Sequence, residues 1–337
     1  MARRLERDPG GRERIALVEA TTPATEPERK AKHTKSADQR SGAWYPRWYW
    51  PSFTGPGTIW LIILFILPFY TVLAVAFGTV DPLFRTPLPV YQPWWWSFAT
   101  FQTTLQKFYV APAVYQPPLI RTFTYVILAS LICLVVGYAV AYYAARYAGK
   151  YRVLILVLLV APFWISYLMR IYAWQSLLQP DGYINDILTA LHLVSEPVLW
   201  LSGKSVTVVL GLVYGYIPFM ILPLFGSLDR INQSLLEAGR DLGASPSQTF
   251  RRVTLPLSKP AILAGLVIVS LPMLGDYYTN NLLGSTRTSM YGNLIDGSVG
   301  QAGQGPEAGS LVLILMVLVI VPMLYYLRET RRAAENA

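Results

Sequence analysis

The side chains of this sequence that could do chemistry are ionisable groups inside long apolar stretches, where a charge is costly and usually functional. Asp276 comes directly before the aromatic pair Tyr277 and Tyr278. A carboxylate beside two aromatic rings can hold an ammonium group by ion pairing and by cation–π attraction. The sequence therefore predicts a site for a small cation, although an aspartate that is only capped by Thr279 or paired with Arg170 fits the same residues.

Arg170 is a second ionisable group within an apolar stretch, and Tyr172 and Trp174 follow it. We expect Arg170 to hold the helices together rather than to meet a cationic substrate, because like charges repel. A place in a substrate pathway stays open for it, and for Tyr172 and Trp174 with it.

Other kinds of site are disfavoured by the residues present. The single cysteine, Cys133, cannot form an internal disulfide, and two histidines leave little material for a metal site. Gly203-Lys204-Ser205 is not a P-loop, because Val198 stands where the first glycine is needed. We therefore expect no metal, no cofactor bound by this chain and no enzymatic activity of its own.

The composition predicts an all-α integral membrane protein. Of 337 residues, 53% are hydrophobic and only 14% are charged, against about 25% charged in soluble domains. The apolar residues form blocks of about twenty, each long enough to cross a hydrocarbon core of roughly 30 Å. Six transmembrane helices are expected, at residues 57–79, 120–145, 153–175, 205–228, 260–279 and 309–327.

The distribution of positive charge predicts the orientation of these spans, since cytoplasmic loops are rich in Lys and Arg. Of 28 basic residues, 22 lie before residue 57, in the loops 146–152 and 229–259, or from residue 328 onward. Four lie in the intervening loops: Arg85, Lys107, Lys204 and Arg287. We therefore expect both termini in the cytoplasm, and we read the net charge of +9 as a topology signal rather than as a nucleic-acid surface.

The chain is expected to divide into four parts. Residues 1–43 are polar and mixed in charge, which predicts a disordered basic cytoplasmic tail. Residues 44–56 are an aromatic interfacial segment, 57–328 the six-helix membrane domain, and 329–337 a cytoplasmic tail.

The loop 229–259 has the pattern of two short helices. Ser234 and Glu237 form a capping-box pattern, and Gly243 suits a left-handed stop. A second capping box, with proline at the first helical position, covers Ser245–Gln248 and starts a helix that is expected to run to Pro256. Such a protruding element suits docking to a cytoplasmic partner, or else rests on lipid head groups.

This loop resembles the EAA loop of the permease subunits of ABC importers. The matching residues are Glu237-Ala238-Gly239, Gly243 after three residues, and Val253-Thr254-Leu255-Pro256 after nine more. Gly239 replaces the family's second alanine and Val253 its isoleucine. The resemblance implies a type I (MetI-like) importer permease fold. It also implies an ATPase-coupling role for Glu237, Ala238, Gly239, Gly243, Ala244, Leu255 and Pro256.

The resemblance further implies partners. These are two cytoplasmic ABC ATPase subunits that use ATP and Mg²⁺, a second related permease chain, membrane lipid and an extracytoplasmic binding protein. The similarity is greatest to the spermidine/putrescine (PotB-like) branch, which implies polyamine import across the bacterial inner membrane, and it suggests a heterodimeric permease pair. Its matching stretches are Ala161–Trp164, Leu168–Trp174, Gly182–Asn185, Gly211–Tyr214 and Tyr291–Ile295.

Two alternatives remain beside this interpretation. Other permeases of the branch carry other small cationic or organic solutes, so the motifs do not decide the cargo. Six apolar spans would also suit a secondary transporter or channel, although the paired repeats and acidic relay typical of such proteins are not evident.

Overall fold

The computed structural model describes residues 49–335, so the predicted tail 1–43 lies outside the described residues. The chain divides into two units after Ile59. The described part of the first unit is the beginning of helix α1 (Tyr49–Ala76). Helix α1 therefore starts inside the predicted interfacial segment 44–56. The second unit begins at Trp60 and contains the rest of α1 and all later elements.

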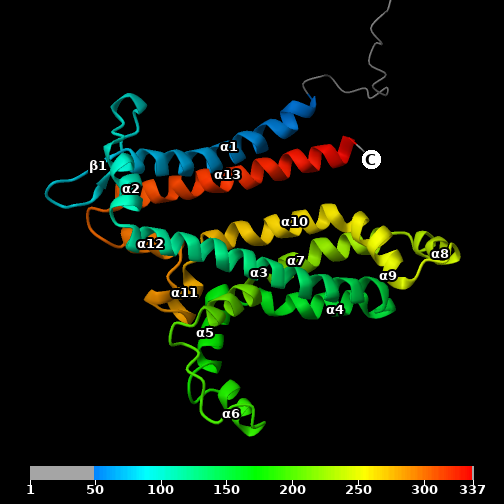
Figure 1. Cartoon of the computed structure of the whole chain (residues 1–337). Helices are drawn as coiled ribbons and strands as arrows, with labels where there is room; N and C mark the ends of the chain where they lie inside the picture. The colour runs from blue at the N-terminus through cyan, green and yellow to red at the C-terminus, as the bar shows by residue number, and fades with distance from the viewer. Residues whose placement is uncertain (1–48, 336–337) are drawn as a thin grey trace, which may run out of the picture. The chain divides into compact units, whose positions relative to one another are not determined.

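Long apolar helices dominate the second unit (Figure 1). Besides α1 they are α3 (Pro112–Arg146), α7 (Ser205–Arg230), α10 (Leu255–Leu274) and α13 (Gly305–Glu335). The shorter helices are α2 (Ala99–Val110), α4 (Arg152–Val160), α5 (Tyr167–Leu177), α6 (Tyr183–Ala190), α8 (Gln233–Asp241), α9 (Pro246–Thr249), α11 (Tyr278–Leu283) and α12 (Tyr291–Val299). Helix α13 continues past residue 328, so the predicted tail 329–337 begins within a helix.

Short elements join these helices. A two-stranded antiparallel hairpin, β1 (Thr79–Val80) and β2 (Pro87–Leu88), pairs Thr79 with Leu88. Four single turns are 3₁₀ helices: η1 (Pro93–Trp95), η2 (Gly149–Tyr151), η3 (Ala161–Trp164) and η5 (Thr286–Thr288). A π turn, η4 (Phe250–Thr254), joins α9 to α10.

The number of membrane spans is only partly as predicted. Among the described residues, four helices are long and apolar enough to cross a membrane, and a bent pair raises this to five. The predicted sixth span, 309–327, lies in α13, whose apolar part is the shorter stretch Gly305–Ile320. The predominantly helical architecture with long apolar helices therefore agrees with the sequence, whereas the count of six spans is not established.

The predicted third span, 153–175, is not one straight helix. Residues Gly149–Trp164 and Tyr167–Leu177 form two helical segments that meet at 89°. Pro162 occupies the first turn of η3, and Ile165 and Ser166 are extended, which ends one helix and starts another. Because Pro162 has no N–H, the α-helical hydrogen-bond pattern gives way to the 3₁₀ turn η3, and the bend follows three residues later at Ile165 and Ser166.

The predicted fifth span, 260–279, ends earlier than expected. Helix α10 stops at Leu274, where the N–H of Gly275 bonds to the carbonyl of Pro272. Asp276 therefore lies in the connection between α10 and α11 and not within a span. Two broken helices, α4–α5 and α10–α11, thus occur in the same protein.

The core lies where α3, α7 and α10 run side by side (Figure 1). Met220 on α7 is fully buried, with Gly137 of α3 and Gly265 of α10 beside its side chain. These glycines let the two helices approach Met220, which is the use of small residues in membrane helix packing.

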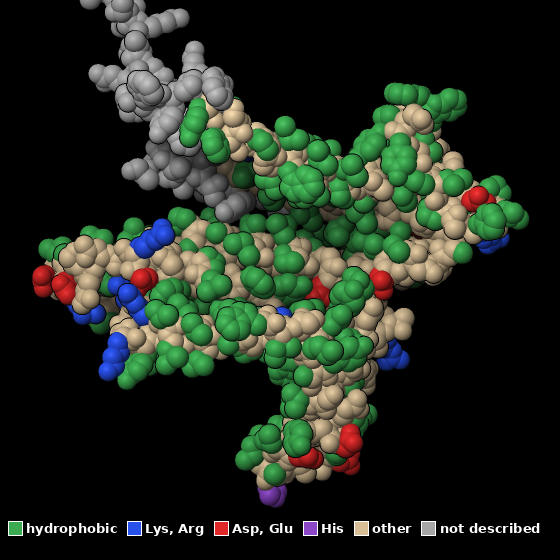
Figure 2. Space-filling view, turned by 180° about the vertical axis from the view of Figure 1, so that it is seen from behind, with side chains coloured by type: hydrophobic (Ala, Val, Ile, Leu, Met, Phe, Trp, Pro, Cys, Tyr) green, Lys and Arg blue, Asp and Glu red, His purple; other side chains and the backbone are tan. Residues whose placement is uncertain are grey.

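The outer surface of the helices is apolar. Trp60, Phe65 and Leu67 on α1 are each more than 60% exposed. Figure 2 shows hydrophobic side chains along the helices, with Lys and Arg gathered toward the end that carries α8 and α9. Such a surface is what helices facing lipid or another membrane chain present.

Candidate functional site

The 229–259 loop forms two short helices that meet at a tight turn. Gly243 adopts a left-handed backbone with φ of 80°. Its N–H donates to the carbonyl of Arg240 and the N–H of Ala244 donates to that of Gly239, which is a Schellman stop. The left-handed helix stop predicted at Gly243 is therefore confirmed, whereas its coupling role stays a prediction.

Of the two predicted capping boxes, the one at Ser245 is present. Ser245 accepts from the N–H of Gln248 at 3.3 Å, and Gln248 Oε1 accepts from the N–H of Ser245 at 2.9 Å, a complete capping box with Pro246 at the first helical position. The box predicted at Ser234 is wrong, because Asn232 caps α8 by accepting from the N–H of Ser234 at 3.1 Å. Asparagine is as good a cap as serine.

The predicted stop of the second helix at Pro256 is also wrong. The chain passes from α9 through the π turn η4 into α10, and the N–H of Leu255 bonds to the carbonyl of Phe250. The five-residue spacing of a π turn accommodates Pro256, which lacks an N–H, in the first turn of α10. The loop therefore continues directly into a long apolar helix.

Helix α8 has one side that is exposed among the described residues. Glu237 and Ala238 are exposed, and Leu242 is 89% exposed. Gly239 faces α9, where an added Cβ would lie 3.6 Å from Thr249 Cγ2. An exposed apolar residue beside a carboxylate on a capped helix is a surface suited to a protein partner.

Residues toward the C-terminal end of α3 contact the 229–259 loop near its beginning and near its end. Phe250 meets the rings of Tyr138 and Tyr142 edge-on, each at a centroid distance of 5.8 Å. Arg146 donates to the carbonyls of Leu228 and Ile231, at 2.8 and 3.1 Å, where α7 leads into the loop. Sequence reasoning missed these residues, although a basic residue in the last turn of a helix is a known signal for carbonyl binding.

The second candidate site surrounds Asp276, which is 6% exposed. Its Oδ2 accepts from the hydroxyls of Tyr167 at 2.7 Å, Tyr216 at 3.0 Å and Thr279 at 2.9 Å. Its Oδ1 accepts from the N–H of Thr279 at 2.9 Å. The capping by Thr279 is therefore present, and we call Asp276, Tyr167, Tyr216 and Thr279 the Asp276 cluster.

The aromatic residues beside Asp276 in the sequence do not bind it. The rings of Tyr277 and Tyr278 pack on each other with centroids 4.0 Å apart. The tyrosine hydroxyls that reach the carboxylate come instead from α5 and α7. The spacing along the chain could not reveal this, because Tyr167 and Tyr216 are brought in by the bend after α4 and by helix packing.

Glycines allow these helices to meet. A Cβ at Gly215 would lie 2.7 Å from Tyr167 Cε2, and one at Gly211 would lie 2.8 Å from Thr279 Cγ2. A Cβ at Gly292 would lie 2.8 Å from the carbonyl oxygen of Asp276. The helix packing expected of Gly211 and Gly215 thus shapes the Asp276 cluster itself.

Arg170 lies in the same region, 8% exposed, and forms no ion pair with Asp276. Its guanidinium carbon is 4.1 Å from the ring centroid of Phe163, 5.6 Å from that of Tyr167 and 5.9 Å from that of Tyr214. Within residues 49–335, its Nε and Nη1 have no hydrogen-bond partner. The arginine is held by aromatic rings instead of by acceptors.

Of the remaining candidates, Trp174 packs edge-on against Tyr214, at a centroid distance of 5.3 Å. Tyr172 is 50% exposed and takes no part in the cluster. In the part of the chain that the structure describes, no group of three or more His, Cys, Asp or Glu could hold a metal ion.

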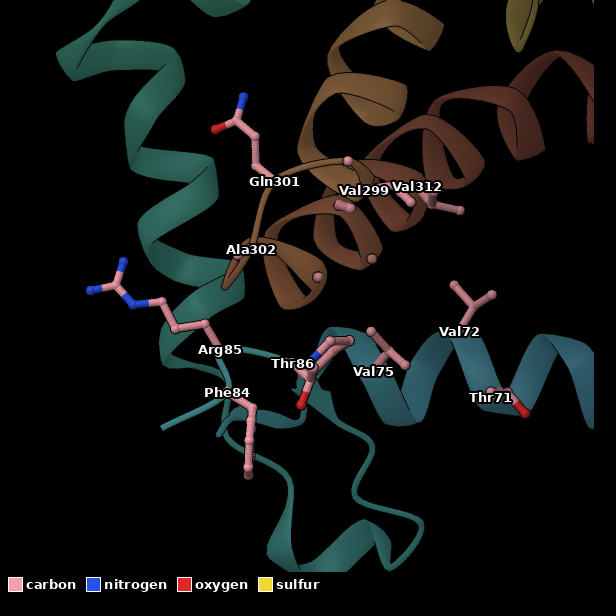
Figure 3. Close-up of a pocket in the computed structure, with 15 residues that line it drawn as sticks. Thr71, Val72, Val75, Phe84, Arg85, Thr86, Val299, Gln301, Ala302 and Val312 are labelled. Carbon is pink, nitrogen blue, oxygen red and sulfur yellow. The ribbon is translucent and has the colours of Figure 1, made fainter. Parts of the chain in front are cut away.

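A separate cavity of about 510 Å³ lies between α1, the hairpin and the connection from α12 to α13 (Figure 3). Val72 and Val75 of α1 line it together with Val299 and Val312, and Arg85 of the hairpin is also among its lining residues. The cavity contains no carboxylate, so it offers no site to a cation.

An apolar helical protein with an exposed, capped loop at one end and a buried charged cluster between broken helices has the build of a membrane transport subunit. Residues 48–331 match the family model of the binding-protein-dependent transport system inner membrane component. The chain belongs to this family, and it is a multi-pass protein of the bacterial inner membrane.

Curated relatives agree with the family. The chain is 33% identical over 273 residues to the spermidine/putrescine transport system permease protein PotB of Escherichia coli (strain K12), covering 81% of this chain and 94% of that protein. The protein of the same name from Haemophilus influenzae is 34% identical over 273 residues, covering 81% and 91%.

A solved structure shares the fold. A chain of a bacterial ABC transporter involved in the import of the acidic polysaccharide alginate superposes with a TM-score of 0.65 and 21% identity, covering 85% of this chain and 96% of that one. The architecture is therefore that of an ABC-importer permease.

Proposed function

We propose that this chain is the permease subunit of an ATP-driven importer of polyamines, and that it provides half of the translocation pathway. The observation that carries the coupling role is the exposed 229–259 loop, with its Schellman stop at Gly243 and its direct continuation into α10. A rigid element that protrudes from a span and leads straight into it can carry a partner's motion into the membrane. Polyamines are proposed because curated relatives that are 33% and 34% identical to this chain carry spermidine and putrescine in their names.

The partners of this proposal follow from the loop and the family. Two ATPase subunits that use ATP and Mg²⁺ would supply the energy from outside this chain, and one of them would bind Glu237 and Ala238 of α8 and the adjoining Leu242. The termini and the 229–259 loop would then lie in the cytoplasm, and the opposite end would meet a polyamine-binding protein. A second permease chain, of related but different sequence, would complete the pathway.

We place the substrate pathway beside the Asp276 cluster. Discontinuous helices commonly form the binding sites of transporters, and here the breaks after α4 and α10 meet at the hydrogen bond between Tyr167 and Asp276. No arginine or lysine among the described residues forms an ion pair with the Asp276 carboxylate. A buried, unneutralised carboxylate favours an ammonium group.

The experiment that tests this function is uptake of labelled spermidine and putrescine by cells with and without this chain. We expect uptake to require the chain and to stop when ATP hydrolysis is blocked. Uptake that continues on an ion gradient alone would contradict the ATP-driven importer. Unchanged polyamine uptake, with another cationic or organic solute lost, would contradict the substrate and leave the importer in place.

A further inference from the structure

The aromatic rings around Arg170 are arranged as a site for a cation. Phe163, Tyr167 and Tyr214 come from η3, α5 and α7 and lie within 6 Å of the guanidinium carbon. Rings at this distance attract a cation through their faces, and cages of this kind recognise alkylammonium groups. The three rings, which we call the aromatic cage, therefore have the chemistry to hold an amine of a polyamine as well as an arginine.

Arg170 is an imperfect occupant of this cage. Its side chain is more than nine-tenths buried. Within the described residues, its Nε and Nη1 N–H groups have no acceptor. A buried donor without an acceptor is unfavourable, and most strongly so when it is charged. The contacts present thus hold Arg170 in the cage without satisfying all of its N–H groups, so it is held less firmly than a fully hydrogen-bonded arginine would be.

The cage and the carboxylate share one residue. The ring of Tyr167 lies 5.6 Å from the Arg170 guanidinium carbon, and its hydroxyl donates to Asp276 Oδ2 at 2.7 Å. An ammonium group that entered the cage would therefore come close to the one carboxylate of the cluster. Arg170 cannot complete this arrangement from its present position, since it forms no ion pair with Asp276.

We propose that the Arg170 side chain is a tethered stand-in for the cargo: it occupies the aromatic cage of Phe163, Tyr167 and Tyr214 until an alkylammonium group of the substrate replaces it. This inference rests on the proposed import of polyamines and adds the site and its internal competitor. Without substrate, the Arg170 side chain occupies the aromatic cage. It also lowers the apparent affinity for cargo by the fraction of time that the cage is occupied.

The test measures binding of labelled spermidine to the assembled transporter in lipid nanodiscs, without the binding protein. Arg170→Gln removes the competing cation and is expected to tighten spermidine binding about tenfold. The affinity of Arg170→Lys is expected to lie between those of the wild type and Arg170→Gln. Ethylguanidinium, a free version of the arginine head group, is expected to compete with spermidine more effectively in Arg170→Gln than in the wild type. Arg121→Gln, which removes a cation of α3 outside the cage, is expected to leave binding unchanged.

The outcomes separate the two proposals. If the wild-type transporter takes up spermidine but Arg170→Gln binds it no more tightly, the stand-in role is wrong and the proposed function is untouched. If the wild type takes up no polyamine, the function itself fails, and ethylguanidinium binding to Arg170→Gln still reports whether the cage accepts a cation. Arg170→Met keeps the bulk of the side chain and is measured if Arg170→Gln does not assemble. Failure of both variants to assemble would make Arg170 a structural residue and overturn the inference.

Discussion

At the scale of single residues, two glycines of the 229–259 loop have different roles that the structure separates. Gly243 stands in open space, so its requirement is the left-handed backbone, with φ of 80°. Gly239 has an ordinary helical setting, where a methyl group would make normal contact with Thr249 at 3.6 Å. Only the first position needs glycine for its conformation.

This difference gives a matched pair of variants. Gly239→Ala is expected to stabilise α8 by about 1 kcal/mol, through helix propensity, and to keep transport. Gly243→Ala is expected to strain the turn by about 1–2 kcal/mol, because side chains disfavour the left-handed region, and larger residues there should abolish coupling. Spermidine uptake and ATPase activity of the assembled transporter are measured for both variants. Normal transport by a bulky Gly243 variant that inserts in the membrane would rule out the docking role.

Gly215 is expected to be essential for the Asp276 cluster. A methyl group there would lie 2.7 Å from Tyr167 Cε2, so Gly215→Ala must push the Tyr167 ring and its hydroxyl away from Asp276. We expect a loss of about 1–3 kcal/mol in stability, from overpacking, together with reduced uptake. Gly226→Ala in the same helix is the control, because a Cβ there meets nothing within 4 Å. Equal thermal stability and uptake in the two variants would contradict the assigned contact.

At the scale of elements, the sequence predicted what depends on local chemistry. The capping box at Ser245 and the stop at Gly243 are interactions over three or four residues, so the residue pattern was sufficient. The break after α4 and the position of Asp276 outside α10 were missed, because the hydropathy of an apolar run does not show where a proline ends its helix. Tyr167 and Tyr216 were missed because they reach Asp276 only through tertiary packing.

The contact of Phe250 with α3 gives a prediction about coupling. Phe250→Leu keeps most of the bulk but removes the edge-on contacts with Tyr138 and Tyr142, which are worth about 1 kcal/mol each. We expect ATPase activity to persist while spermidine transported per ATP falls. Tyr143→Leu is the control, since Tyr143 lies on the same helix, is 57% exposed and packs on Tyr147 instead. A normal transport ratio in Phe250→Leu would show that α3 does not take part.

At the scale of the whole molecule, Glu307 connects helices α13, α2 and α3 at the end opposite α8 and α9. Glu307 of α13 accepts from Lys107 of α2 and from the hydroxyl of Tyr115 of α3, each at 2.7 Å. Burial acts to lower the pKa of Lys107, but the hydrogen bond and charge of Glu307 raise it above its usual 10.5. The stabilisation that this pair gives through Lys107 is therefore present from neutral pH up to the ordinary lysine pKa of 10.5, and it is lost as pH rises through the raised pKa.

Glu307→Gln is accordingly expected to lower the free energy of unfolding by about 1 kcal/mol, a value limited by the solvent exposure of Lys107. The thermal stabilities of the two proteins should differ by a constant amount between neutral pH and 10.5, the usual lysine pKa, and should converge as pH rises through the raised pKa of Lys107. A difference that grew with rising pH would have the wrong sign for this pair.

The central claim is that ATP hydrolysis by a partner drives polyamines through this membrane chain by way of the 229–259 loop. The most direct measurement is the number of spermidine molecules transported per ATP hydrolysed by the assembled transporter in proteoliposomes, for the wild type and for Gly243→Val. We predict a fixed ratio for the wild type, and ATP hydrolysis without transport, or neither, for the variant. Spermidine uptake by the wild type without ATP hydrolysis, or an unchanged ratio in Gly243→Val, would contradict the account.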